Sequence, residues 1–260
     1  MKRTGRIPTV APPPEFPAAA LIAPWLIAAM WLVIAERLRL ETVFASGARR
    51  ICGDGFAEFA TSLAFVTVVA TIIPKLGGVT GLSAMTLRDQ IDFALRAYPK
   101  LLTICVAAYF GLGWIAWKFG LTSLGHLAPH LLHGVDGVAF DQYAVGGRAW
   151  SALIAALGLL MAIDRGQGGA ADFAALGAAL RRRWPSLLLG VLAATLMAIP
   201  LATAQQAARL ATKRFSASDI ANTMKNFIFF GFVVGFALLR LAATATILCL
   251  CLRWSYRHDA

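Results

Sequence analysis

Apolar residues along this chain gather into long runs that are broken by short polar links. The runs are continuous, whereas the strands of a membrane β-barrel alternate apolar and polar positions, so helices are predicted. A helix of about 20 apolar residues crosses the hydrocarbon core of a bilayer. Six such spans are predicted, at residues 16–35, 56–74, 101–117, 149–163, 185–203 and 226–252. The fourth span is short, and the sixth carries Arg240 near its middle.

This pattern predicts an all-α fold, a polytopic transmembrane helical bundle of about six spanning helices with short interfacial amphipathic helices. Residues 1–15 are basic and rich in proline and form an N-terminal tail, and residues 16–257 form a single membrane domain. A basic interfacial helix is also expected over residues 205–225. Lys and Arg are slightly more numerous in the links on the side of the N-terminus. This excess favours cytoplasmic N- and C-termini in a bacterial cytoplasmic (inner) membrane.

Composition agrees with a membrane environment and argues against a soluble domain. Of the 260 residues, 59% are hydrophobic and 14% are charged, whereas soluble domains carry about 25% charged residues. The net charge of +11 does not indicate nucleic-acid binding, because the basic residues flank apolar runs and no nucleic-acid motif accompanies them. Basic residues at the ends of spans contact anionic headgroups. The expected partners are therefore membrane lipids with anionic headgroups and other membrane proteins, and not nucleic acid.

A short motif recurs before the third and the fifth predicted span. It reads Arg96-Ala97-Tyr98-Pro99-Lys100-Leu101-Leu102 in the first copy and Arg182-Arg183-Trp184-Pro185-Ser186-Leu187-Leu188 in the second, 86 residues later. In each copy an interfacial amphipathic helix, residues 87–97 or 171–183, is predicted to end at the proline, which fits the first turn of the span. Two spans separate the copies, so both lie on one side of the membrane, as in a parallel internal repeat. A chance match of so short a motif is the alternative.

The order of basic amphipathic helix, aromatic-Pro and Leu-rich span, repeated in a six-span chain, resembles a known bacterial membrane domain. This six-span domain is associated with some glycerophosphodiester phosphodiesterases and with related uncharacterised bacterial membrane proteins. The closing segment Leu252-Arg253-Trp254-Ser255-Tyr256-Arg257 is similar to the basic segment that ends many of them, so the likeness covers about residues 85–257. No phosphodiesterase catalytic domain accompanies it in this sequence, and that activity is not implied.

Three histidines in the link between the third and fourth spans, His126, His130 and His133, fall on one face of a helix. A short amphipathic helix is therefore expected in this link, lying in the membrane interface. Imidazoles gathered in this way can bind a divalent metal or sense pH, with Asp136 as a further ligand. The simpler interpretation is that the histidines line the wet face of the helix, and no cofactor is then required.

Arg240 is the second candidate, because a charge near the middle of a span is costly and faces a partner or a watery cavity. Glu58 and Asp164 are the carboxylates expected to pair with it, although both are predicted near span ends. Together the three residues form a candidate intramembrane anion or ion-pair site. The alternatives are a purely structural ion pair, and a shifted span that brings Arg240 nearer the interface.

Motifs of common enzymes are absent from the sequence, including His-Glu-x-x-His, Gly-x-Ser-x-Gly and the phosphate-binding loop that ends in Gly-Lys-Ser/Thr. The chain is therefore interpreted as a non-enzymatic protein, an accessory or lipid-interacting component of the bacterial envelope. The alternative is a small transporter, or a metal or pH sensor, that uses Arg240 or the histidine face. An enzyme of unfamiliar type is the third interpretation.

Overall fold

The computed structural model describes residues 18–42, 44–72, 86–120, 144–216 and 222–258. Within these ranges the chain is 94% helical and contains no strand. The helices are α1 (Ala18–Thr42), α2 (Gly47–Ile72), α3 (Leu87–Phe119), α4 (Ala144–Gly166), α5 (Phe173–Ser216) and α6 (Asn222–His258). The all-α class predicted from the sequence is confirmed.

Polar contacts continue α1 beyond the first predicted span, past residue 35 to Thr42. Arg37 Nε contacts Glu41 Oε1 at 2.8 Å, and Arg39 Nη1 contacts Glu36 Oε1 at 2.8 Å. Pairs three or four residues apart stabilise a helix by about 0.2–0.5 kcal/mol each. The polar end of α1 is therefore helical although it is too charged to lie in lipid.

α4 explains why the fourth predicted span is short. The helix contains 23 residues, which at 1.5 Å per residue gives about 34 Å, enough to cross a hydrocarbon core of about 30 Å. Residues 154–163 of this helix are all buried. Because neighbouring helices cover α4, its small alanine and glycine residues pack against protein and no long apolar run is needed.

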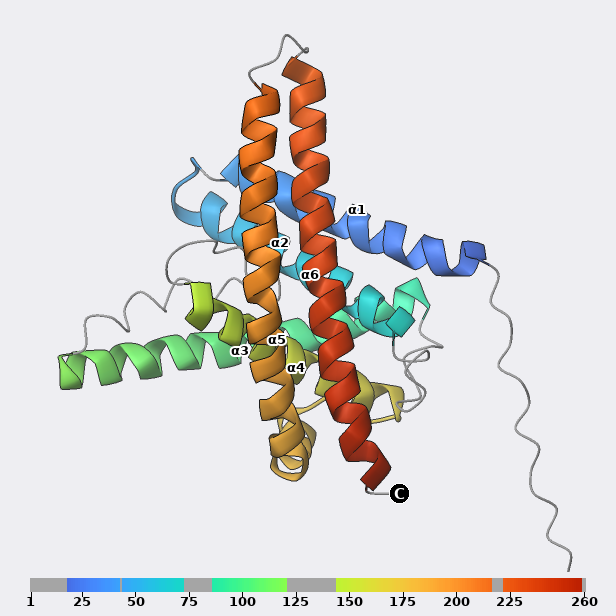
Figure 1. Cartoon of the computed structure of the whole chain (residues 1–260). Helices are drawn as coiled ribbons and strands as arrows, with labels where there is room; N and C mark the ends of the chain where they lie inside the picture. The colour runs from blue at the N-terminus through green and yellow to red at the C-terminus, as the bar shows by residue number, and fades with distance from the viewer. Residues whose placement is uncertain (1–17, 43, 73–85, 121–143, 217–221, 259–260) are drawn as a thin grey trace, which may run out of the picture.

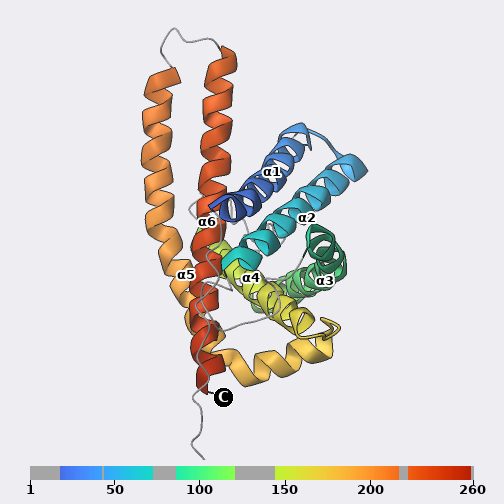
Figure 2. The same ribbon diagram turned by 90° about the vertical axis from the view of Figure 1, so that its right-hand side faces the viewer.

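The prolines of the repeated motif lie inside continuous helices, so the prediction that each proline ends a helix is wrong. Pro99 lies within α3 and Pro185 within α5, and both are exposed. A proline removes one main-chain hydrogen bond and bends a helix, and a long helix survives the loss. The first turns of α5 run at a steep angle to the rest of that helix (Figure 2).

α5 also differs from the prediction at its other end. Residues 205–216 continue this helix of 44 residues, whereas a separate interfacial helix was expected over 205–225. The continuation carries α5 well beyond the length that a bilayer core requires.

α5 and α6 form a long antiparallel hairpin, and the other helices pack across its side (Figures 1 and 2). α1 and α2 form a second hairpin that crosses the first, and α3 also runs across it. α4 contacts α2, α3, α5 and α6, and its residues 154–163 are all buried, so it lies inside the protein. The described helices thus form two crossed layers.

Glycines allow the helices of each hairpin to approach closely. A Cβ added at Gly190 of α5 would lie 3.1 Å from Leu248 Cδ2 and 3.3 Å from Cys251 Cβ of α6. A Cβ added at Gly53 of α2 would overlap the Cγ2 methyl of Thr42 at the end of α1. Small residues at such contacts are typical of helix packing in membranes.

Five helices of the described part are long and apolar enough to cross a membrane: α2, α3, α4 from Arg148, α5 to Ala208, and α6 from Met224 to Ser255. The most apolar part of α3 is only 7% buried, whereas that of α4 is 67% buried. α4 therefore lies inside the protein, while α3 presents apolar side chains outward, as lipid-facing helices do. The chain is a helical membrane protein. α1 is not among these five helices, so the first predicted span, and with it the count of six, stays a prediction.

Candidate functional site

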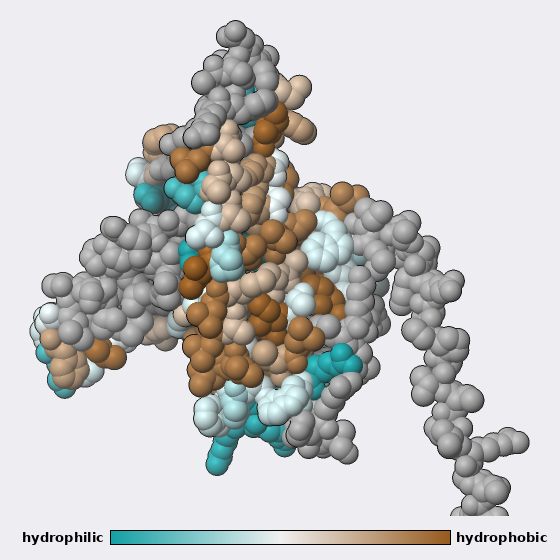
Figure 3. Space-filling view, viewed as in Figure 1, coloured by the Kyte–Doolittle hydropathy of each residue, from teal (hydrophilic) through white to brown (hydrophobic). Residues whose placement is uncertain are grey.

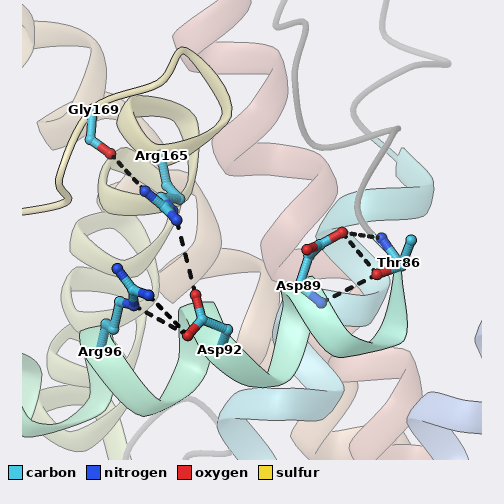
Figure 4. Close-up of polar contacts among 6 residues, drawn as sticks. All are labelled: Thr86, Asp89, Asp92, Arg96, Arg165 and Gly169. Atoms are coloured by element: carbon cyan, nitrogen blue, oxygen red, sulfur yellow. Dashed lines mark hydrogen bonds and ion pairs between the residues drawn. The ribbon is translucent and has the colours of Figure 1, made fainter.

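The start of α3 is held by reciprocal hydrogen bonds between Thr86 and Asp89 (Figure 4). Asp89 Oδ2 accepts from Thr86 N at 2.9 Å and from Thr86 Oγ1 at 2.7 Å, and Asp89 N donates to Thr86 Oγ1 at 3.2 Å. This is a capping box, which satisfies main-chain donors that a helix start leaves open. The polar first turns of α3 are therefore a well-ordered helix start.

Asp92 joins the start of α3 to the end of α4. Its Oδ1 accepts from Arg96 Nε and Nη2, both at 3.1 Å, and its Oδ2 lies 3.8 Å from Arg165 Nη2. Arg165 Nη1 also donates to the carbonyl oxygen of Gly169 at 3.4 Å (Figure 4). All three charged groups are about half exposed or less, and pairs of this kind contribute about 0–1 kcal/mol. The cluster connects the two helices, and its one carboxylate is shared by two guanidinium groups.

Asp164 shapes the turn between α4 and α5. Its Oδ2 accepts from Ala171 N at 2.9 Å, and Lys100 Nζ donates to the carbonyl oxygen of Ala171 at 2.6 Å. Ala171 has a positive φ of 51°, and Gly168 has a φ of 88°, so the turn needs these side-chain contacts to hold its left-handed residues. Lys100 thereby ties the first copy of the repeated motif to the segment just before the second.

A shallow groove of about 550 Å³ runs along the first turns of α3. It is lined by Leu87, Arg88, Ile91, Asp92 and Leu95. All five come from one helix, so the groove is an open surface and offers few converging groups to a ligand. The polar cluster around Asp92 is therefore better explained as structural than as catalytic.

A second polar region lies where the end of α6 meets the bend of α5, and we call it the basic foot. It consists of Arg181, Arg182, Arg183, Trp184, Arg253 and Trp254. Arg183 is 7% exposed, and its Nη1 donates to Ser255 Oγ at 3.0 Å, which joins the two helices. Trp184 and Trp254 are 58% and 59% exposed. Apolar side chains cover the lower face of the hairpin, and hydrophilic residues gather below them (Figure 3).

The two copies of the repeated motif begin at matching points of their helices. α3 begins at Leu87 and α5 at Phe173, which are 86 residues apart, the same offset as in the motif. The residue before each helix caps it, because Asp172 Oδ1 accepts from Ala175 N at 2.7 Å, much as Thr86 caps α3. The correspondence thus extends from the motif to the helix start.

Burial also follows the motif, with one difference. Arg96 and Arg182 are exposed in both copies, as are the two prolines. Tyr98 is half-buried and its hydroxyl donates to the carbonyl oxygen of Gly55 at 3.0 Å, whereas Trp184 is exposed. The aromatic ring therefore packs against α2 in the first copy and faces outward in the second.

Arg240 is half-buried within α6. The described ion pairs do not include one between Arg240 and Asp164, whose carboxylate binds the α4–α5 turn. Glu58 lies in α2, and its side chain is outside the description. The site of Arg240, Glu58 and Asp164 therefore stays a prediction.

The histidine face lies outside the described residues, as does its neighbour Asp136. Within the described ranges, no group of three or more His, Cys, Asp or Glu side chains is arranged to hold a metal ion.

Sequence reasoning missed Asp92, Arg165 and the bond between Arg183 and Ser255. The spacing of Asp92 and Arg96, four residues apart in a helix, is a signal that favours an ion pair. The other two contacts join segments far apart in the chain, and no local pattern predicts them. No family model, curated protein or solved structure matches this chain.

Proposed function

We propose that this chain is a multi-pass protein of the bacterial inner membrane, with six spans and both termini in the cytoplasm. In this proposal it is a non-enzymatic accessory or lipid-interacting component of the envelope. The observation that carries the proposal is the outward apolar surface of α3, α5 and α6. Apolar side chains on this surface are 40–68% exposed, among them Leu102, Phe110, Leu192, Leu196 and Leu239. Exposure of such side chains is unfavourable in water and is accommodated by lipid.

The matched starts of α3 and α5 support a parallel repeat within the membrane domain. Three polar contacts connect the beginnings of α3 and α5 with the ends of α4 and α6. They are the ion pair of Asp92 with Arg165, the hydrogen bond of Lys100 to Ala171 and the hydrogen bond of Arg183 to Ser255. These four ends belong on one side in the predicted topology, and basic residues there suit the cytoplasmic face. Membership of the six-span group associated with glycerophosphodiester phosphodiesterases is part of this proposal.

Extraction and lipid analysis test the proposal. The chain should stay in membranes washed with alkaline carbonate and dissolve only in detergent. Purified in a mild detergent, it should retain phospholipid with a headgroup composition different from that of the whole membrane. A defined lipid mixture incubated with the protein should keep its composition. Extraction by carbonate would overturn the membrane assignment, and conversion of lipid would overturn the non-enzymatic role.

Transport is the second candidate function, and the half-buried Arg240 is the observation that favours it. A charge inside a span commonly marks a substrate path. Vesicles that contain the parent chain would then take up an anionic solute, and Arg240→Leu would abolish this uptake. If Arg240→Leu retains both stability and activity, Arg240 is not the anchor of such a path.

A further inference from the structure

We propose that the basic foot is a headgroup site for an acidic phospholipid. This inference rests on the proposed lipid-interacting function and deepens it, because it names the lipid class and the residues that bind it. The site lies on the outer face of the α5–α6 hairpin, at the level where the apolar surface of the hairpin ends (Figure 3).

The two copies of the repeat differ in charge at matching positions. Asp89 and Asp92 of the first copy correspond to Ala175 and Ala178 of the second. In the first copy Asp92 pairs with Arg96, so the junction balances its own charge. The second copy has no carboxylate at either position, and its Arg182 receives no such partner.

The second copy also gains cations where the first has apolar residues. Leu95 and Ala97 correspond to Arg181 and Arg183. Arg181 and Arg182 are exposed, and within the described part of the chain neither forms an ion pair. The exposed guanidinium groups of Arg181 and Arg182 are therefore not neutralised by any described carboxylate, and guanidinium matches phosphate in geometry.

A hydrogen bond between α5 and α6 fixes the shape of the foot, and a buried guanidinium atom favours a negative charge nearby. The bond from Arg183 to Ser255 Oγ holds the ends of α5 and α6 together. Two residues earlier, Arg253 has a buried Nε that finds no acceptor among the described residues. Desolvating a cation without an acceptor is unfavourable, and a neighbouring phosphate offsets part of that cost.

The surface above the foot suits the acyl chains of the same lipid. Four apolar side chains follow one another at intervals of four residues along α5, and each is more than half exposed: Trp184, Leu188, Leu192 and Leu196. Residues four apart lie on one helix face, so the four side chains form a continuous apolar stripe. Exposed tryptophans at its lower end favour the headgroup level of a bilayer. A phospholipid can place its phosphate at the arginines and its acyl chains on the stripe. A soluble anion could bind the arginines only and would leave the apolar stripe uncovered.

Lipid titration of the full chain tests the site. Phosphatidylglycerol and phosphatidylcholine with identical acyl chains are titrated into the protein in neutral detergent, and bound lipid is counted by native mass spectrometry. The parent should bind phosphatidylglycerol more tightly. Removing an arginine near a membrane surface weakens binding to acidic lipid about fivefold. Arg181→Gln/Arg182→Gln should therefore lower the affinity for phosphatidylglycerol about 25-fold and leave phosphatidylcholine unchanged.

Two further variants separate the site from general charge and from misfolding. Arg49→Gln/Arg50→Gln removes the same charge from exposed positions at the start of α2 and should change the affinity less than twofold. Ala178→Asp, at an exposed position of α5, restores the carboxylate found at position 92 and should weaken phosphatidylglycerol binding about fivefold. Circular dichroism checks that each variant keeps the parental helix content.

The headgroup site would be overturned if the two double variants lost affinity for phosphatidylglycerol equally. It would also be overturned if Arg181→Gln/Arg182→Gln lost none of this affinity. A parent chain without preference for phosphatidylglycerol would do the same. The proposed function survives those results if the purified chain still retains a distinctive set of lipids, and it falls if the chain retains none.

Discussion

Gly53→Ala tests the contact between the end of α1 and the start of α2. Gly53 is buried in α2, and a Cβ at this position would overlap the Cγ2 methyl of Thr42 and lie 3.1 Å from its Cβ. Thr42 is 6% exposed, and its Oγ1 donates to the carbonyl oxygen of Leu38 at 2.9 Å. The new methyl group therefore forces either Thr42 to rotate or the two helices to separate.

Two opposing terms determine the size of the effect on stability. Alanine in a helix is favoured over glycine by about 0.5–1 kcal/mol. Rotation of Thr42 sacrifices a hydrogen bond with a net value of about 0.5–1.5 kcal/mol, and separating packed helices costs about 1–3 kcal/mol. We expect Gly53→Ala to lower the free energy of unfolding by about 1 kcal/mol. In the Thr42→Ser background the Cγ2 methyl is absent, so the same change should be neutral or stabilising by up to about 1 kcal/mol.

A double-mutant cycle measures this reversal of sign. The four chains are unfolded in mixed micelles by increasing fractions of SDS, and far-UV circular dichroism follows the transition. The coupling between the two positions should reach about 1–2 kcal/mol, as for residues in direct contact. The same loss of stability in both backgrounds would refute the contact, as would stabilisation in both.

Three further predictions use the same unfolding assay or a metal titration. Thr86→Ala and Asp172→Ala each remove a helix N-cap and should each lower stability by about 1 kcal/mol; no change in either variant would contradict the matched helix starts. Asp92→Asn weakens pairs that are partly exposed and should cost less than about 1 kcal/mol, so a loss above 2 kcal/mol would mean that the cluster is structurally essential. Calorimetric titration with Zn²⁺ should give the same result for the parent and for His126→Ala/His130→Ala, and a loss of binding in the variant would favour the metal sensor.

The helices were largely predictable because hydropathy marks them directly. Five span-length helices cover five of the predicted spans, and the burial of α4 accounts for the short fourth one. The helix ends were less predictable, since ion pairs such as Arg37 with Glu41 prolong a helix without changing its hydropathy. Proline disfavours helix interiors, so the sequence predicts breaks at Pro99 and Pro185, but the long helices α3 and α5 contain them. The crossing of the two hairpins depends on packing between distant segments, and no local pattern specifies it.

The candidate sites were also predictable only in part. The repeated motif was visible in the sequence, and its extension to the helix starts became evident only from the caps at Thr86 and Asp172. The Asp164 carboxylate binds the main chain of the turn that contains the left-handed Ala171, and the hydropathy pattern does not predict such a turn. The basic foot required the α5–α6 pairing, because Arg183 and Ser255 are 72 residues apart.

Topology measured by thiol labelling tests the central claim most directly. Cys52 is exposed near the start of α2 and should react with a membrane-impermeant maleimide from outside the cytoplasmic membrane. In the Cys52→Ser background, Arg96→Cys and Arg182→Cys should both react only in inverted vesicles, with Cys52→Ser alone as the control. This pattern would establish that the two copies of the repeat share the cytoplasmic side. Labelling of the two introduced cysteines from opposite sides, or of both from the same side as Cys52, would contradict the account.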